Sequence, residues 1–500
     1  MKKILALVTL LTIVASLKAN NVKVENVTYD KNTKKITFDL SWENAWRQTI
    51  DYHDAVWVFA KYRTVNQPRW QHANIVFNST NVAGGALETI ETNDKYGFFV
   101  RLKTDSVGNI QPTQVSFEAT DGLTGLIGLY PDFQVYAIEM VYVPQGSFYV
   151  GAPPTKYDAN LFEDMVIYRY NPTHTNPTFS PLYISSEDKI STGNTFASPY
   201  ISSKGISASF PKGYNAFYCM KHEVSNEQLV AFFNAIGTDF IRFYGLGMSG
   251  SSSGFKYKNI TRNQDTVDIV GTKTTNGWEF TCEAGYENHP AVMTPYTLIS
   301  YLAWAGLVPM TELQYVKACR GPLQPVRNEA ACGVSVTTAL GGNTIGSEDT
   351  FFVDLKTPAE RLKRHYSGPT TRRLRRCGYA ADSTTNRITA NATFYGILNM
   401  TDNVAEITIS INDTNEFYTG ILDHPNNAVE PDDYGMKSYI VPAYFSESGY
   451  GSNVLYYRGS ENGEKEYYDP YNFFEPTDED GTTRTYFPYP IGGRGVRKPN

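Results

Sequence analysis

Cysteine and histidine are scarce in this 500-residue chain, which has five cysteines and seven histidines. An odd number of cysteines leaves at least one thiol unpaired within the chain. The sequence has no C-x-x-C motif, no Cys/His cluster with zinc-ligand spacing and no H-x-x-x-H pair. It also lacks a Gly-rich phosphate loop and a nucleophile elbow. These absences argue against the common zinc and nucleophile sites, and most of the cysteines are expected to be small buried side chains.

Charged residues are also sparse, at 19% of the chain, and the formal net charge is −7. Nucleic acid is therefore not an expected partner. At the N-terminus, Lys2 and Lys3 precede an apolar run over residues 4–14, and residues 15–19 resemble a cleavage region. The run is too short to span a membrane, so residues 1–19 are predicted to be a signal peptide.

No later segment reaches the length of a membrane-spanning helix, and no cysteine precedes Cys219. A lipid-anchored N-terminus is therefore not expected. We expect an exported protein that is not a lipoprotein and has no transmembrane segment in its mature form. Its predicted location is the periplasm, the cell surface or the extracellular space.

Aromatic residues are plentiful, at 14% of the chain, and glycine and proline are frequent. This composition suits a loop-rich β or α+β protein of two domains. Residues 20–134 contain strand-like patterns over 22–29, 35–42, 55–62, 97–103 and 114–118, separated by turn signals. They predict an all-β sandwich of immunoglobulin or fibronectin type. Its tryptophans are expected in the core, with an aromatic ligand platform as the alternative: Trp42, Trp46, Trp57 and Trp70.

Residues 135–498 are predicted to form the second domain. A strand ending at Val224 is followed by Ser225 as a helix N-cap, with Gln228 three residues later. Two further helices are predicted over 295–305 and 311–320, the second capped by Thr311. Residues from about 152 to 212 are rich in Ser, Thr, Asn, Pro and Tyr, which favours a functional loop or a surface insertion.

Six blocks of this second domain resemble, in order, the motifs of formylglycine-generating-enzyme (sulfatase-modifying-factor) domains. The block at 399–406 reads N-M-T-D-N-V-A-E, and the block at 217–234 contains E-V-S-N-E-Q. The resemblance implies an α+β, C-type-lectin-like fold with long loops, preceded by the β-sandwich. The other blocks lie at 139–151, 289–321, 457–460 and 495–497.

In that family, the segment that matches residues 399–406 is a tight loop that binds a structural calcium ion. The resemblance therefore implies calcium as a cofactor, bound by side-chain oxygens of Asn399 and Glu406 and by the carbonyls of Asp402 and Val404. Calcium prefers six to eight oxygen ligands of these kinds. The alternative is an Asn/Asp-rich turn between two apolar strands.

The enzymes of the family oxidise a substrate cysteine with a pair of copper-binding cysteines that follow the block at 457–460. Here the last cysteine is Cys377, so no thiol lies in that region. Soft thiolates are the ligands that Cu(I) prefers. Ala405 and Ile407 also stand where the family has tryptophan. The resemblance therefore implies a catalytically degenerate member, which is not an enzyme and binds no copper.

Two segments are candidates for ligand binding. Residues 361–376 hold seven cations, which can bind a carboxylate- or phosphate-bearing partner such as an acidic glycan, or can be a solvated surface. Residues 461–480 are acidic and rich in tyrosine, a residue that supplies rigid contact area. The candidate residues are Arg372, Arg373, Arg375, Arg376, Tyr467, Tyr468 and Tyr471.

The sequence thus predicts an exported, non-enzymatic binding or structural protein of the bacterial cell envelope or surface. It is similar in role to envelope proteins of Bacteroidetes that are linked to gliding and secretion. Its expected partners are other envelope or surface proteins, or glycans, and it can form a homo-oligomer. Two alternatives are a metal-dependent oxidase of the formylglycine-generating type and a calcium-dependent glycan-binding lectin.

Overall fold

The computed structural model describes most of the predicted first domain and about half of the second. The described residues are 21–64, 67–76, 85–119, 132–150, 168–171, 178–190, 205–236, 248–251, 254–260, 266–274, 277–293, 295–326, 331–333, 374–381, 385–401, 403–409, 411, 418–422, 425, 431–432, 435–436, 455–458 and 491–499. The predicted signal peptide lies outside these residues.

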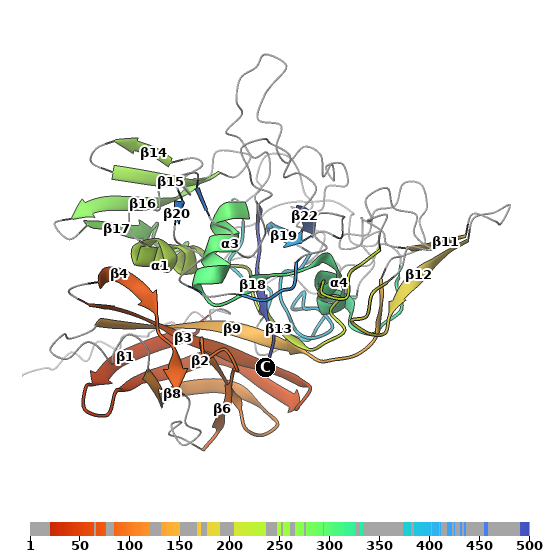
Figure 1. Cartoon of the computed structure of the whole chain (residues 1–500), viewed down its shortest axis with the longest axis horizontal. Coiled ribbons are helices and arrows are strands. Elements are labelled where there is room, and N and C mark those ends of the chain that lie inside the picture. Colours follow the sequence, from red (N-terminus) through yellow and green to blue (C-terminus); the bar gives the residue numbers. More distant parts are fainter. Residues whose placement is uncertain are drawn as a thin grey trace, which may run out of the picture.

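The N-terminal part of the chain folds into a curled antiparallel sheet, which lies beneath the helices in Figure 1. Each of the five strand-like patterns falls on an observed strand, although several strands run longer than predicted. The strands are β1 (Lys23–Asp30), β2 (Lys35–Thr49), β3 (Tyr52–Thr64), β4 (Gln67–His72), β5 (Ile75–Val76), β6 (Leu87–Glu91), β7 (Phe98–Leu102), β8 (Ser106–Ala119) and β9 (Asp132–Val143).

The rest of the described chain holds three helices and short strands, so the protein is β-rich. The helices are α1 (Asn226–Ile236), α3 (Pro295–Trp304) and α4 (Glu312–Arg320). The strands are β10 (Phe148–Val150), β11 (Tyr168–Asn171), β12 (Thr178–Ile184), β13 (Phe217–Met220), β14 (Met248–Ser251), β15 (Gly254–Ile260), β16 (Thr266–Thr274), β17 (Gly277–Cys282), β18 (Val308–Pro309), β19 (Ala405–Ile409), β20 (Pro431–Asp432), β21 (Gly435–Met436), β22 (Leu455–Arg458), β23 (Ile491–Gly492) and β24 (Gly495–Arg497).

Both predicted helix caps are confirmed. The Ser225 hydroxyl accepts from the Gln228 backbone N–H at 3.3 Å, and the Gln228 side chain accepts from the Ser225 N–H at 3.0 Å. Thr311 and Gln314 form the same reciprocal capping box before α4. Each box satisfies two backbone donors that a helix start leaves without partners. None of the three described helices is long and apolar enough to cross a membrane.

The segment predicted to be an irregular insertion, from about 152 to 212, contains regular structure. β11 and β12 lie inside it, and β12 pairs with both β10 and β11 in a three-stranded antiparallel sheet. Because this range is rich in serine and threonine, its composition favoured a loop and did not predict these strands. Much of the remaining range lies outside the described residues.

Strand β9 connects the two predicted domains, and the boundary predicted between residues 134 and 135 falls inside it. Along one edge β9 pairs with β3, from Asp54–Val141 to Arg63–Asp132. Along its other edge it pairs with β13 over residues 140–143, and β13 pairs in turn with β24. The N-terminal strands and these later strands therefore form one 12-stranded sheet.

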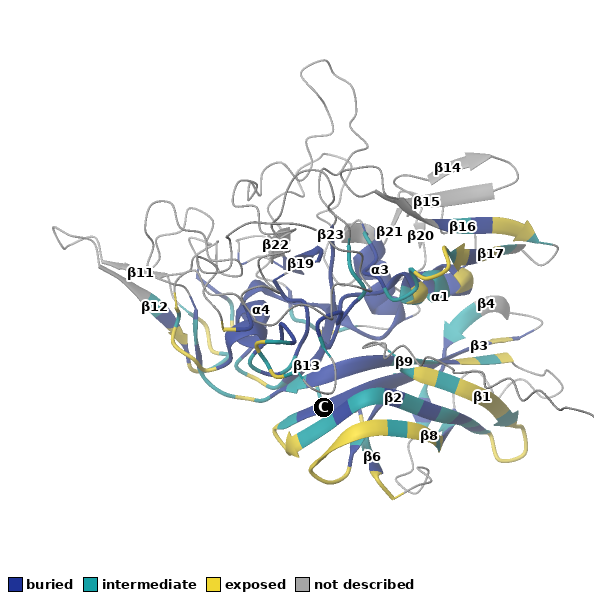
Figure 2. Cartoon of the chain, turned by 180° about the vertical axis from the view of Figure 1, so that it is seen from behind, coloured by how far each residue is buried: buried dark blue, intermediate teal, exposed yellow. Residues whose placement is uncertain are grey.

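The side chains of β3 alternate between two hydrophobic cores, because successive residues of a strand point to opposite faces. One core takes Ala55, Trp57 and Phe59 and includes residues of α1 and α3. The other takes Val56, Val58 and Ala60 and lies inside the curled sheet. Figure 2 shows buried residues continuing from the sheet into α3 and α4. Trp42 and Trp57 are fully buried, Trp42 in the core inside the curled sheet, as predicted, and Trp57 in the core that includes residues of α1 and α3.

The C-terminal end of α3 is also held by the N-terminal sheet. The carbonyls of residues 304–306 accept hydrogen bonds from Lys61 Nζ at 2.6 Å, from Trp57 Nε1 at 2.8 Å and from the Arg497 guanidinium. Arg497 lies flat against Trp57, 3.9 Å from the ring centroid. Cations stabilise the negative end of a helix and satisfy its unpaired carbonyls. This contact joins β3, α3 and β24 into one structure.

Candidate functional site

The 399–406 segment is a buried turn that leads into β19. Asn399 and Asn403 both have left-handed backbone conformations, with φ of 61° and 66°. Asparagine adopts this conformation more readily than most residues. The Leu398 N–H donates to the Lys221 carbonyl at 2.9 Å, which fixes the start of the turn. The side chains of both asparagines contact a neighbouring segment.

That neighbouring segment is residues 375–378, and the two asparagines bind its backbone. Asn403 Oδ1 accepts from the Arg375 N–H at 3.0 Å, and Asn403 Nδ2 donates to the Arg375 carbonyl at 3.1 Å. Asn399 Oδ1 accepts from the Gly378 N–H at 2.6 Å. Both amides are almost completely buried, so these bonds are made without competition from water. We call this arrangement the asparagine clamp.

Glu406 lies in β19 and forms a buried ion pair with Arg494. The pair is bidentate, with Nη2–Oε1 at 2.6 Å and Nε–Oε2 at 2.8 Å, and both side chains are fully buried. The same guanidinium donates to the Met220 and Lys221 carbonyls, each at 3.2 Å. Both oxygens of the Glu406 carboxylate are therefore engaged with a cation that belongs to the protein.

The predicted calcium ligands can now be located. Asn399 and Glu406 both use their side-chain oxygens as acceptors for protein donors, the Gly378 N–H and the Arg494 guanidinium. Val404 is buried in the turn, and Asp402 lies outside the described residues. Among the described residues, no group of three or more His, Cys, Asp or Glu side chains is placed to hold a metal ion. Calcium at this turn stays a prediction.

The asparagine clamp holds two of the predicted ligand-binding arginines. Arg375 and Arg376 are partly exposed. The Arg375 guanidinium lies 5.1 Å from the centroid of the Tyr379 ring, and Arg376 Nη2 donates to the Tyr379 carbonyl at 3.3 Å. Guanidinium groups bind carboxylates and phosphates through paired N–H donors. The other candidates lie outside the described residues: Arg372, Arg373, Tyr467, Tyr468 and Tyr471.

No protein-family model and no curated protein matches this chain. The likeness to formylglycine-generating-enzyme domains therefore rests on the six sequence blocks. Three of those blocks are neighbours in the 12-stranded sheet, where β13 pairs with β24 and with the C-terminal end of β9.

All five cysteines are free thiols, and four of them are buried. Burial raises the pKa of Cys219 to about 12, and burial with nearby glutamates does the same for Cys282. Burial also raises the pKa of Cys319 and of Cys377. Thiolates are the form that attacks substrates and binds metals. At neutral pH the thiols with raised pKa values are protonated, which is unfavourable for thiol chemistry: Cys219, Cys282, Cys319 and Cys377.

A second ionic cluster, which the sequence did not suggest, lies between the sheet and the clamp. Lys221 follows β13 and contacts Asp54 of β3 at 3.0 Å and Glu139 of β9 at 2.9 Å. All three residues are at most 4% exposed. The three residues lie far apart in the sequence, so no local pattern could have grouped them. We call this cluster the buried triad.

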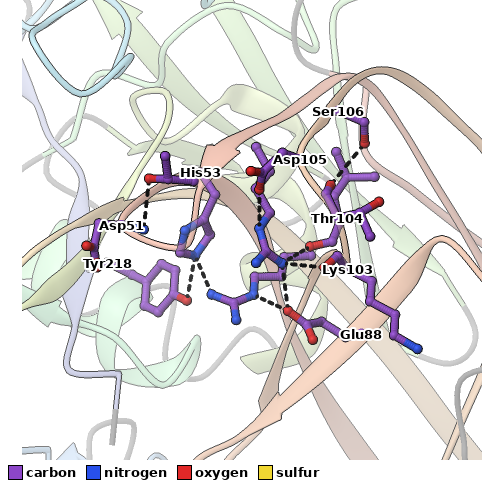
Figure 3. Close-up of polar contacts among 12 residues, drawn as sticks. Asp51, His53, Glu88, Lys103, Thr104, Asp105, Ser106 and Tyr218 are labelled. Atoms are coloured by element: carbon purple, nitrogen blue, oxygen red, sulfur yellow. Dashed lines mark hydrogen bonds and ion pairs between the residues drawn. The ribbon is translucent and has the colours of Figure 1, made fainter.

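A third polar network links β3 to β13 (Figure 3). His53 Nε2 lies 3.1 Å from the Tyr218 hydroxyl and 3.1 Å from Arg101 Nη1. Glu88 accepts from Arg101 at 2.8 Å and from Arg47 at 3.0 Å. Burial and the Arg101 charge lower the pKa of His53 to about 3. The imidazole is therefore neutral near pH 7 and accepts hydrogen bonds.

This network predicts an acid-sensitive contribution to stability. An unfolded histidine titrates near pH 6.5, so between about pH 6.5 and about pH 3 the unfolded chain binds a proton that the native chain does not. Native stability then falls as the pH drops through this window, by ~2 kcal/mol at about pH 5. We expect His53→Gln to lose less stability than the wild type between about pH 7.5 and about pH 5 in urea unfolding. Equal losses in both proteins would show that His53 does not contribute.

Proposed function

We propose that this chain is an exported, non-enzymatic binding protein of the bacterial envelope or surface, and that its partner is anionic, such as an acidic glycan. The observation that carries the proposal is the asparagine clamp, which fixes the backbone beneath Arg375 and Arg376. A fixed backbone reduces the entropy lost when these arginines bind a ligand. The nearby arginines at 372 and 373 extend the same basic sequence.

The proposed fold is a degenerate sulfatase-modifying-factor domain of C-type-lectin-like type, preceded by an immunoglobulin-like sandwich. The six ordered sequence blocks and the β-rich architecture with three short helices support it. The buried, protonated thiols support a role without catalysis, because thiol oxidation requires an accessible thiolate. In this proposal the 399–406 turn serves recognition by holding the basic segment in place.

Replacing both arginines by alanine is expected to weaken binding to an acidic polysaccharide by at least about tenfold, since charge-assisted hydrogen bonds contribute roughly 1.5–3 kcal/mol each. Affinity can be measured by biolayer interferometry against a panel of immobilised acidic and neutral glycans. The matched control is Lys23→Ala with Lys31→Ala, which removes two exposed charges from β1 and the turn that follows it.

Equal affinity of the arginine variant and the wild type for every glycan bound would contradict the proposal. Binding that a chelator abolishes would instead support the calcium-dependent lectin, because the arginine contacts need no metal.

A further inference from the structure

The buried triad has the composition and geometry of a self-reacting site. Lys221 Nζ lies 3.0 Å from Asp54 Oδ2 and 2.9 Å from Glu139 Oε2. The other Asp54 oxygen, Oδ1, accepts from the Trp46 backbone N–H at 2.9 Å. An amine therefore lies against a carboxyl group whose second oxygen is held by a fixed donor. A further carboxylate lies within reach of the same amine.

The sheet register places the three side chains on one face. Asp54 pairs with Val141 of β9, and Glu139 lies two residues before Val141, which puts both carboxyl groups on the same side. The Lys221 N–H donates to the Glu139 carbonyl at 2.9 Å, which extends the β13–β9 ladder to Lys221. Three adjacent strands thus fix the three groups, and no flexible loop positions any of them.

Charge balance favours neutral groups at this place. A buried ammonium with two carboxylates carries a net negative charge, which is costly away from water. Burial raises the pKa of both Asp54 and Glu139, and the two neighbouring carboxyl groups raise the pKa of Lys221. With one proton on the two carboxyl groups the triad is neutral overall, and the form that can react has Asp54 as the acid, Glu139 as the carboxylate and Lys221 as the ammonium. Transfer of one proton from Lys221 to Glu139 makes all three groups neutral and frees the amine lone pair.

We propose that Lys221 and Asp54 form an intramolecular isopeptide bond, with Glu139 as the proton acceptor. The Nζ lone pair attacks Asp54 Cγ, the Cγ–Oδ2 bond breaks, and Oδ1 becomes the amide oxygen. The Trp46 N–H stabilises the negative charge that develops on Oδ1 during the attack. Exclusion of water protects the bond from hydrolysis.

The step is balanced without any added reactant. Of the three ammonium protons, one passes to Glu139, one leaves with the Asp54 hydroxyl as water, and one stays on the amide nitrogen. No atom is oxidised or reduced. The only product that departs is one water molecule. The bond would link β3 covalently to the residue after β13, closing a loop across 167 residues of sequence.

Intact-mass spectrometry of the folded, full-length protein tests the proposal. We expect the mass to be lower by one water molecule than the mass of the same chain kept unfolded in denaturant from synthesis onward. Protease digestion followed by fragmentation is expected to give one branched peptide that contains Lys221 and Asp54. Lys221→Arg and Glu139→Gln are expected to show the full, unlinked mass. Asp54→Asn is expected to link with loss of ammonia and to give the same product as the wild type.

The wild-type measurement is decisive even if a variant fails to fold. A folded wild-type protein with its full sequence mass would overturn the proposal and leave the triad as an ion cluster. A branched peptide joining Lys221 to Glu139, or a linked Glu139→Gln variant, would overturn the assigned roles.

Discussion

A fragment that begins at residue 135 is expected not to fold, although the sequence places a domain boundary there. The cut removes β3 and the first residues of β9, so the rest of β9 loses the ladder that pairs it from Asp54 to Arg63. It also removes Trp57 and Phe59 from the core that contains α1 and α3. Loss of a single large buried aromatic side chain costs roughly 3–5 kcal/mol, and whole domains are stable by only ~5–15 kcal/mol.

The fragment can be compared with the full chain by circular dichroism and thermal unfolding. A deletion of residues 23–30 is the control, because it removes β1, a largely exposed strand that pairs only with β2 among the described strands. We expect the control to unfold cooperatively and the 135–500 fragment to show no cooperative transition. A soluble fragment with a sharp unfolding transition would show that the second part is an independent domain.

Glu406→Gln is expected to destabilise the protein by about 3–5 kcal/mol, because it leaves the Arg494 charge buried without its counterion. The substitution changes neither the shape nor the volume of the side chain appreciably. The loss of stability therefore measures the effect of removing the negative charge. Urea unfolding gives the change in free energy. Glu25→Gln, on the exposed strand β1, is the matched control and is expected to change stability by less than about 0.5 kcal/mol.

The same measurement tests calcium at this position. If Arg494 is the partner of Glu406, adding calcium or a chelator leaves unchanged the difference in unfolding free energy between the wild type and Glu406→Gln. If Glu406 is a calcium ligand, calcium stabilises the wild type and has a smaller effect on the variant. A variant as stable as the wild type under both conditions would contradict the importance of the ion pair.

Local features were predictable because their causes are local. The capping boxes before α1 and α4 each involve residues three positions apart, and the alternation of β2 is visible within its own sequence. The role of β3 was harder to predict. Its apolar run is typical of a strand buried on both faces, but that pattern does not reveal which elements cover each face. The core that β3 shares with α3 was therefore not part of the sequence prediction.

The partners of the site residues could not be predicted for a related reason. Arg494 lies 88 positions from Glu406, and Asp54 lies 167 positions from Lys221, so only the folded sheet brings them together. The sequence did single out Asn399 and Glu406 as oxygen-bearing side chains of one short segment. It could not distinguish a metal ligand from an acceptor for the protein's own N–H groups, since both uses require the same oxygens.

The measurement that tests the proposed function most directly is the affinity of Asn403→Gly for an acidic polysaccharide that the wild type binds. Glycine keeps the left-handed backbone at this position and removes only the amide that holds Arg375, while every arginine and the net charge remain. Loss of the two Asn403 hydrogen bonds of the clamp predicts an affinity about tenfold weaker. Affinity equal to that of the wild type, in a variant of unchanged fold, would contradict a recognition role for the asparagine clamp.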